Sequence, residues 1–241
     1  MNQRVTLVTG GARRVGAEIV RAFAARGDAI VLHHGSSPDD AKRLADELTS
    51  NGTPVHVVPA DLRDAAAPAY VVDEAMRVFG KLDVVVSSAS IMMDHAFEAV
   101  TPDEWDAVSD VNLRAPFFLS QAAAKVMKPG SNIIHMCDHL ASEARFPRLI
   151  PHQATKAGVA NLVTTLAGAL APNIRVNGVA PGLVLKPADF SAEKLTQFLR
   201  DVPLGRSGTP ADVTHAILFL IEATYITGVV LSVDGGRHLW R

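Results

Sequence analysis

The stretch Thr9-Gly10-Gly11-Ala12-Arg13-Arg14-Val15-Gly16 decides the fold, because it joins an apolar segment to an amphipathic one through a glycine-rich turn. The β-branched run Val5–Thr9 predicts a strand before the turn, and the stretch Arg14–Ala25 predicts a helix after it. This arrangement brings backbone N–H groups close to a ligand, and the helix dipole there favours a negative pyrophosphate. The sequence therefore predicts a nucleotide-binding turn with contacts from Gly10, Arg13, Arg14 and Gly16.

The rest of the chain alternates short β-branched runs with longer helical patterns, which predicts a parallel sheet built from βαβ units. Val84-Val85-Val86 is apolar on consecutive residues, as expected of a strand covered by helices on both faces. The expected strands are Val5–Thr9, Ala29–His33, Val55–Pro59, Asp83–Ser87, Asn132–Cys137, Ile174–Val179 and Val229–Val233. The expected helices are Arg14–Ala25, Pro38–Ser50, Ala66–Phe79, Pro102–Met127, His152–Ala171 and Pro210–Ala223. This order predicts one α/β domain over residues 1–241, a Rossmann-type doubly wound parallel sheet of about seven strands flanked by helices.

Composition and charge exclude several classes of function. The chain has 241 residues, 48% hydrophobic and 20% charged, and its formal net charge of −2 favours neither nucleic acid nor an anionic membrane as a partner. No apolar run approaches the length of about 18 residues that a membrane-spanning helix needs. Met1-Asn2-Gln3-Arg4 leads directly into a strand without a signal-peptide pattern, Cys137 is the only cysteine, and the nine histidines show no metal-ligand spacing. These features predict a cytoplasmic protein without a metal that acts on a small molecule.

The end of the second expected strand bears on the choice of cofactor. NAD-binding folds usually place an acidic residue there to bind the ribose hydroxyls. This chain reads Leu32-His33-His34-Gly35-Ser36-Ser37, with no carboxylate to repel a 2′-phosphate. Arg13, Ser36 and Ser37 can hydrogen-bond that phosphate and His34 lies beside them, so the sequence favours NADPH; alternatively, the serines cap the helix that begins at Pro38. Asp61-Leu62, after the third strand, is expected to flank the adenine.

Taken together, several segments resemble the short-chain dehydrogenase/reductase family over essentially the whole chain. They are Thr9–Gly16, Asp61-Leu62, Ser87-Ser88-Ala89-Ser90, Asn112, His152-x-x-x-Lys156, Pro181-Gly182 and Val233-Asp234-Gly235-Gly236. The resemblance implies that Asn112 holds a proton-relay water, and it implies a homotetramer or homodimer. Further cofactor contacts implied by the resemblance are Ser88, Ala89, Ser90, Lys156, Pro181 and Gly182.

Within that family, the chain looks most similar to pteridine reductases and bacterial dihydromonapterin reductases. Arg14 stands where the wider family has the middle glycine of its turn, Asp138 stands where most members place the catalytic serine, and the tail Asp234–Leu239 resembles the dihydromonapterin reductase ending. Two features depart from the pattern. Met92 stands near the position of an aromatic residue that stacks on the pterin, and His139 is also in register for the serine position, because the interval to His152 is about one residue longer than usual. Expected substrate contacts are Arg14, Ser90, Met92, His139, Phe146 and Leu183.

The largest departure is a histidine in place of the family's catalytic tyrosine. The chain has only two tyrosines, Tyr70 and Tyr225, and neither is followed four residues later by a lysine. His152 and Lys156 are four residues apart and share one face of a helix. A free histidine titrates near pH 6.5, but a lysine cation beside it disfavours the protonated imidazole. A ketone would therefore lack a good proton donor here, unless Asp138 or the substrate offsets the lysine.

An imine substrate needs no such donor. Once the C=N nitrogen is protonated from solvent, hydride transfer gives a neutral amine, and a carboxylate such as Asp138 favours the iminium form. The sequence therefore predicts an NADPH-dependent reductase of a C=N bond in a dihydropterin or another cyclic imine, with Asp138, His152, Lys156 and Asn112 as catalytic residues. One alternative is a carbonyl reductase in which His152 is the general acid. Another is a non-catalytic nucleotide-binding protein, which the loss of Tyr and Ser supports and the retention of Lys156, Asn112 and Asp138 argues against.

Overall fold

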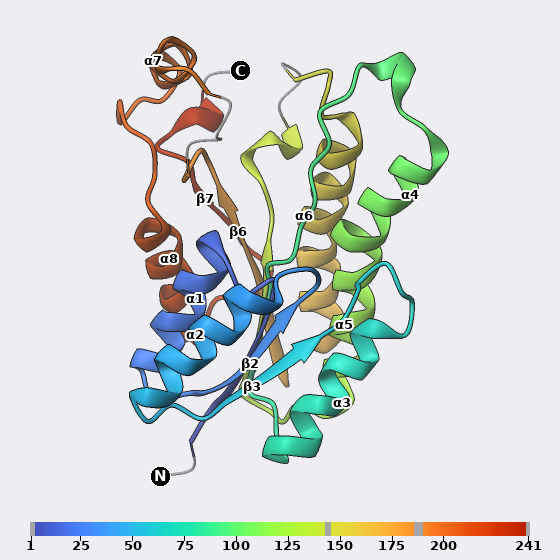
Figure 1. Ribbon diagram of the computed structural model, residues 1–241, viewed down its shortest axis with the longest axis vertical. Helices are drawn as coiled ribbons and strands as arrows, with labels where there is room; N and C mark the ends of the chain where they lie inside the picture. Colours follow the sequence, from blue (N-terminus) through green and yellow to red (C-terminus); the bar gives the residue numbers. More distant parts are fainter. Residues whose placement is uncertain (1–2, 143–145, 186–189, 240–241) are drawn as a thin grey trace.

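The computed structural model describes residues 3–142, 146–185 and 190–239. This part of the chain forms one seven-stranded parallel sheet in the order β3-β2-β1-β4-β5-β6-β7 (Figure 1). Each strand lies within two residues of its expected bounds, so the predicted doubly wound sheet is confirmed. The strands are β1 (Val5–Thr9), β2 (Ala29–His34), β3 (Val55–Pro59), β4 (Val84–Ser87), β5 (Ser131–Met136), β6 (Ile174–Pro181) and β7 (Val230–Val233).

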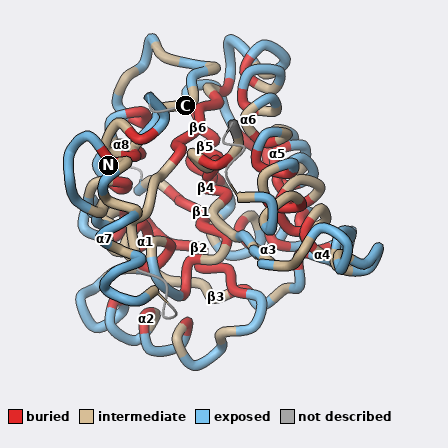
Figure 2. Tube along the Cα trace, turned by 90° about the horizontal axis from the view of Figure 1, so that it is seen from above, coloured by how far each residue is buried: buried red, intermediate tan, exposed pale blue. Residues whose placement is uncertain are grey.

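Helices cover both faces of the sheet. On one face lie α1 (Arg14–Ala25), α2 (Pro38–Ser50) and α8 (Pro210–Glu222), and on the other lie α3 (Ala67–Phe79), α5 (Ala115–Ala124) and α6 (Ile150–Leu170) (Figure 1). Alternate strand residues supply the two cores, as a pleated strand requires: Val8 packs with the first set and Leu7 with the second. Seen from above, the buried residues follow the strands through the centre, while the helices expose their outer faces (Figure 2).

The expected helix Pro102–Met127 is wrong as one continuous helix. It begins as predicted at α4 (Pro102–Ser109), where Thr101 caps the backbone N–H of Glu104. A π-helical turn, Asp110–Arg114, then separates α4 from α5. Pro116 supplies the physical reason, because a proline has no N–H to donate to the carbonyl four residues earlier, here that of Asn112. The break therefore falls where Asn112 leaves the regular helix and enters the site described below.

A further helix, α7 (Ala192–Arg200), was not expected from the sequence. Its N-terminus is capped by Ser191 and its sequence is amphipathic, but none of its residues is fully buried. Short 3₁₀ turns also occur at η1 (Phe97–Ala99), at η3 (His139–Ser142) after β5, and at η4 (Arg237–Leu239) near the C-terminus. Within the described ranges, no helix combines the length and apolar character needed to cross a membrane.

Candidate active site

A cleft of about 550 Å³ opens at the carboxyl ends of β1 to β4. It brings together residues from the glycine-rich turn, the β2 and β3 ends and the loop after β4, which lie far apart in the sequence. Met93, Ala107 and Val111 also line it and were not predicted. The predicted cofactor contacts on its wall are Gly10, Arg13, Arg14, Gly16, His34, Ser36, Ser37, Asp61, Leu62, Ser88, Ala89 and Ser90.

The glycine-rich turn is shaped so that only glycine fits at two positions. A Cβ at Gly16 would lie 2.1 Å from the carbonyl oxygen of Gly10. Gly10 has a φ of 64°, and a Cβ there would lie 2.9 Å from the Cα of Ala89. The backbone at Gly10 therefore lies too close to the loop after β4 for a side chain to fit between them. Helix α1, which follows the turn, has no capping side chain within the described residues, so its first-turn N–H groups can donate hydrogen bonds to a ligand.

Arg13 and Arg14 differ in what holds them. The Arg13 guanidinium lies 3.7 Å from the Asp40 carboxylate at the start of α2, so this predicted phosphate contact is shared with a carboxylate. Arg14 has a φ of 53°, the left-handed region that a side chain rarely adopts. This backbone agrees with the interpretation that Arg14 occupies a glycine position of the turn.

The loop after β4 is fastened to the first strand by a residue that the sequence reasoning missed. The Thr9 hydroxyl oxygen accepts hydrogen bonds from the backbone N–H groups of Ser88 (3.0 Å) and Ala89 (3.2 Å). Thr9 is fully buried. A buried hydroxyl at the last position of a strand, directly before a glycine turn, is the signal that would have found it, because such a group needs a partner.

The β2 end carries no carboxylate, as predicted. Burial lowers the pKa of His34, so its ring is neutral at neutral pH and adds no positive charge to this wall of the cleft. Asp61, on the opposite side, is paired with Arg63 at N–O distances from 2.5 Å to 3.0 Å, and hydrogen bonds from Arg63 lower the pKa of the Asp61 carboxyl. The local charge of that carboxylate is therefore offset within its own turn.

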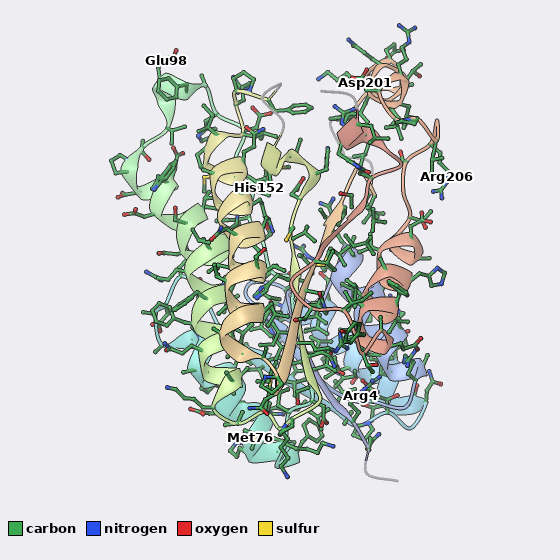
Figure 3. All side chains as sticks on the ribbon, turned by 180° about the vertical axis from the view of Figure 1, so that it is seen from behind. Arg4, Met76, Glu98, His152, Asp201 and Arg206 are labelled. Atoms are coloured by element: carbon green, nitrogen blue, oxygen red, sulfur yellow. The ribbon has the colours of Figure 1, made fainter. Side chains whose placement is uncertain are left out.

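A hydrogen bond joins Asp138 and His152 at the reaction centre. His152 lies in the first turn of α6, at the carboxyl end of the sheet (Figure 3), and its Nε2 lies 3.1 Å from Oδ2 of Asp138. Burial pulls the pKa of Asp138 upward, but hydrogen bonds from His139 and His152 together hold it well below its usual range. The carboxylate is thus ionised at neutral pH. Its side chain is 23% exposed, whereas that of His152 is 5% exposed.

The other ring nitrogen of His152 has two neighbours. Nδ1 lies 3.3 Å from the carbonyl oxygen of Ile91 and 3.5 Å from Nδ2 of Asn112. A protonated Nδ1 would donate to Ile91, and a bare Nδ1 would accept from Asn112. In both states Nε2 keeps its hydrogen and directs it toward Asp138. The carboxylate, which is partly buried, is the more exposed group of this pair.

Asn112 is held by four hydrogen bonds at the π-helical turn. Its Oδ1 accepts from the hydroxyl of Ser90 (3.1 Å) and the backbone N–H of Ile91 (2.9 Å). Its Nδ2 donates to the carbonyl of Ile91 (2.8 Å) and to the hydroxyl of Thr155 (3.3 Å). Asn112 thereby ties the loop after β4 to the active-site helix. Thr155 and Ile91 are further members of the site that the sequence reasoning did not name.

Lys156 is buried one turn after His152. Its Nζ donates to the carbonyl oxygen of Met136 at 2.7 Å, at the end of β5. Burial lowers the pKa of this ammonium, while the Asp138 charge opposes the shift. Lys156 is thus anchored on the strand end beside Asp138, and Asp138 rather than Lys156 is hydrogen-bonded to His152. Asp138 therefore places a negative charge next to His152, where the sequence argument required one to offset the charge of Lys156.

His139 faces away from His152. Its Nδ1 lies 2.9 Å from the carbonyl oxygen of Pro181 and 3.1 Å from Oδ1 of Asp138, and its ring meets the Phe198 ring edge-on at 6.4 Å. The sequence left both Asp138 and His139 in register for the family's serine. Here Asp138 turns toward the tyrosine position, and His139 links it to the β6 end and to α7.

The remaining predicted substrate contacts fall into two groups. Leu183 lines a small hollow with Phe198 and with Gly182, a predicted cofactor contact. Phe146 lies 5.8 Å from the guanidinium of Arg237, which also stacks on Phe198 at 3.9 Å. These side chains gather beyond His139. Met92 is 57% exposed and does not line the cleft described above; its neighbour Met93 does.

Comparison with known proteins agrees with this geometry. A family model described as enoyl-(acyl carrier protein) reductase matches residues 10–238. Versicolorin reductase of Emericella nidulans is 34% identical in an alignment that covers 98% of this chain and 96% of that protein. Both matches span the glycine-rich turn, the reaction centre and most of the C-terminal segment.

Two solved structures are similar over nearly the whole chain. A short-chain dehydrogenase/reductase from Serratia marcescens superposes with a TM-score of 0.93 at 33% identity, covering 98% of this chain and 99% of that one. A blue fluorescent protein from a metagenomic library, crystallised in complex with NADPH, superposes with a TM-score of 0.93 at 32% identity and 98% coverage of both chains. The sheet order and the helix placement are therefore shared with these proteins.

Proposed function

The chain belongs to the short-chain dehydrogenase/reductase family, and from this premise we propose that it is an NADPH-dependent reductase of C=N bonds. Family membership makes it an NAD(P)-dependent oxidoreductase. The non-catalytic alternative is therefore set aside. What the family does not decide is the substrate, because this fold supports many reactions and the site residues must select among them.

The cleft fits the phosphorylated cofactor. Gly10 and Gly16 allow the tight backbone packing of the turn, and the uncapped first turn of α1 supplies N–H donors for a pyrophosphate. Ser36 and Ser37 sit at a strand end without a carboxylate, which suits a 2′-phosphate. Bound NADPH would supply the hydride for the reduction. The similar structure that contains NADPH supports the same choice.

One observation carries the substrate class: the group that the protein exposes at the reaction centre is an ionised carboxylate. Asp138 is the more exposed partner of the pair, and its hydrogen bonds from His139 and His152 keep it charged. A carboxylate stabilises a positive iminium nitrogen beside it and repels a developing alkoxide. The site therefore favours a substrate that arrives as a cation and leaves as a neutral amine.

The other residues orient this carboxylate. His152 holds Oδ2 of Asp138 and His139 holds Oδ1, so both oxygens have fixed directions. Asn112 fixes the loop after β4 against α6, and Lys156 is positioned to hold the nicotinamide ribose as the family pattern implies. Within this class we favour a dihydropterin or another small cyclic imine, because Arg14, Asp138 and the Asp234–Leu239 tail match the pteridine reductase pattern. A homotetramer or homodimer is the assembly that the same likeness suggests.

A second candidate is carbonyl reduction. The 3.1 Å contact between His152 and Asp138 favours it, because a carboxylate beside an imidazole supports the protonated ring that a general acid needs. In this candidate, Asp138 and His152 together replace the family's tyrosine. It requires Nε2 of His152 to transfer its proton to the substrate, although that proton is hydrogen-bonded to the Asp138 carboxylate.

The proposal is tested by measuring NADPH consumption with dihydropterin, dihydrofolate, simple cyclic imines and matched ketones. We expect turnover with imines and little with ketones of the same ring size. Ketone turnover at or above the imine rate would refute the C=N assignment and favour the second candidate. NADPH binding, measured in parallel, separates failure of the substrate choice from failure of the cofactor choice.

A further inference from the structure

The first two amide groups of the glycine-rich turn are both bound by one residue. The backbone N–H of Gly10 donates to Nδ1 of His33 at 3.1 Å, and the backbone N–H of Gly11 donates to the carbonyl oxygen of His33 at 2.9 Å. His33 lies near the end of β2 and is 1% exposed. The turn after β1 is therefore shaped by the neighbouring strand.

The third contact of His33 fixes which ring nitrogen carries the proton. Nε2 lies 3.0 Å from the carbonyl oxygen of Ala60, at the end of β3, and a carbonyl only accepts. Nε2 must therefore donate, and Nδ1 must keep a lone pair for the Gly10 N–H. Only the neutral ring protonated on Nε2 satisfies both contacts, and it links the ends of β1, β2 and β3.

We propose that His33 is a positioning residue for the cofactor, whose neutral ring sets the conformation of the glycine-rich turn. The inference rests on the proposed nucleotide site. In this arrangement, the N–H groups of Gly10 and Gly11 bind His33 and fix the turn, whereas the N–H groups in the first turn of α1 remain available to the cofactor phosphates. Gly10 needs this support, because its φ of 64° and its closeness to Ala89 leave little tolerance.

The surroundings of His33 keep the ring neutral. The pKa of His33 is lowered to about 4, mainly by burial; the hydrogen bond to Ala60 raises this pKa in part, and the adjacent His34 lowers it. Asp61, which directly follows the Ala60 partner of His33, is engaged by Arg63. A second proton would place an N–H against the N–H of Gly10. Because the folded pKa is depressed, the stabilisation is complete above the ordinary histidine range and is lost as the pH falls toward 4.

The test compares three variants in the full-length protein. His33→Val removes both ring contacts, and His33→Gln offers an oxygen for Gly10 and an N–H for Ala60. Thr6→Val is the matched control: Thr6 is fully buried on β1 and bonds Asp28, at the opposite end of the sheet, where Figure 3 labels Arg4. The dissociation constant of NADPH is measured by fluorescence titration, and amide hydrogen exchange at Gly10 is measured without cofactor.

We expect His33→Val to weaken NADPH binding about tenfold to a hundredfold, the range implied by one unsatisfied buried donor, and to expose the Gly10 amide to exchange. His33→Gln should recover most of the affinity, and Thr6→Val should change it less than about twofold while still lowering the melting temperature. Unchanged affinity in His33→Val, or equal loss in His33→Val and Thr6→Val, would overturn the inference. Failure of the unaltered protein to bind NADPH would instead overturn the proposed cofactor.

Discussion

Replacing Asp138 by asparagine tests the charge at the reaction centre with little change in shape. Asparagine keeps an oxygen that can accept from His152 or His139 but removes the negative charge. If the carboxylate stabilises a cationic substrate, Asp138→Asn should lower kcat/KM for imines. A hydrogen bond between the oxygen of the new asparagine and His152 should not restore the rate, because it carries no negative charge.

The magnitude follows from Coulomb's law. A carboxylate and an iminium nitrogen about 4 Å apart interact by about 4 kcal/mol at an effective dielectric constant of about 20. Because the Asp138 side chain is 23% exposed and shares its charge between two histidines, solvent and hydrogen bonds screen part of this energy. About 2–3 kcal/mol should remain, which corresponds to a loss in rate of roughly 30-fold to 160-fold.

The assay is NADPH consumption with a cyclic imine at saturating cofactor. His152→Gln serves as the comparison, because glutamine can still donate to Asp138 but cannot act as an acid, and it should cost less than about fivefold. Asp94→Asn, an exposed carboxylate on the loop after β4, should be neutral. The reasoning is refuted if His152→Gln loses more imine activity than Asp138→Asn.

Three further predictions address the turn, the charge and the tail. Arg14→Gly should raise the free energy of unfolding by about 1 kcal/mol in chemical denaturation, because it removes a side chain from a left-handed backbone, and it should weaken NADPH binding in a titration. The imine rate should not fall with acid down to about pH 4, because the pKa of Asp138 is depressed below the ordinary aspartate value of about 3.9 and the carboxylate stays ionised in the folded protein. A pH profile of kcat/KM checks this. Arg237→Met should raise KM for the substrate about fivefold with a smaller effect on kcat, because Arg237 packs α7 through Phe198, and steady-state kinetics measure the split.

The fold was predictable because the spacing of apolar residues distinguishes its strands from its helices. The strands are apolar on consecutive residues, and Thr101 and Thr209 mark helix starts with a proline at the next position, so the elements follow from local chemistry. The break at Asp110–Arg114 had a visible signal in Pro116, which the helical pattern around it outweighed. The α7 helix also had a visible signal, because Ser191 is a helix-capping residue and the sequence after it is amphipathic, but the helix is short and buries no residue completely.

The reaction centre was predictable in its membership but not in its contacts. Spacing placed both Asp138 and His139 near the family's serine position, and a shift of one residue in a loop cannot be resolved without the 3₁₀ turn η3 that follows β5. The partners of Lys156 and His33 are backbone carbonyls and amides of other strands, and such groups leave no trace in side-chain patterns. Long-range backbone contacts are therefore the part that required the structure.

The negative charge of Asp138 connects two departures from the family pattern at the proposed reaction centre, those at Asp138 and at His152. In the family pattern, a serine and a tyrosine hydroxyl face the substrate and can donate to an alkoxide. In the site that we propose, Asp138 stands at the serine position, its hydrogen-bonded partner His152 stands at the tyrosine position, and Lys156 donates to the carbonyl oxygen of Met136. An alkoxide about 4 Å from Asp138 would be disfavoured by the same energy, about 2–3 kcal/mol after screening, that favours an iminium. The two substrate classes therefore differ by roughly twice that amount, and Asp138→Asn should narrow the preference for imines over ketones, lowering the first rate and raising the second.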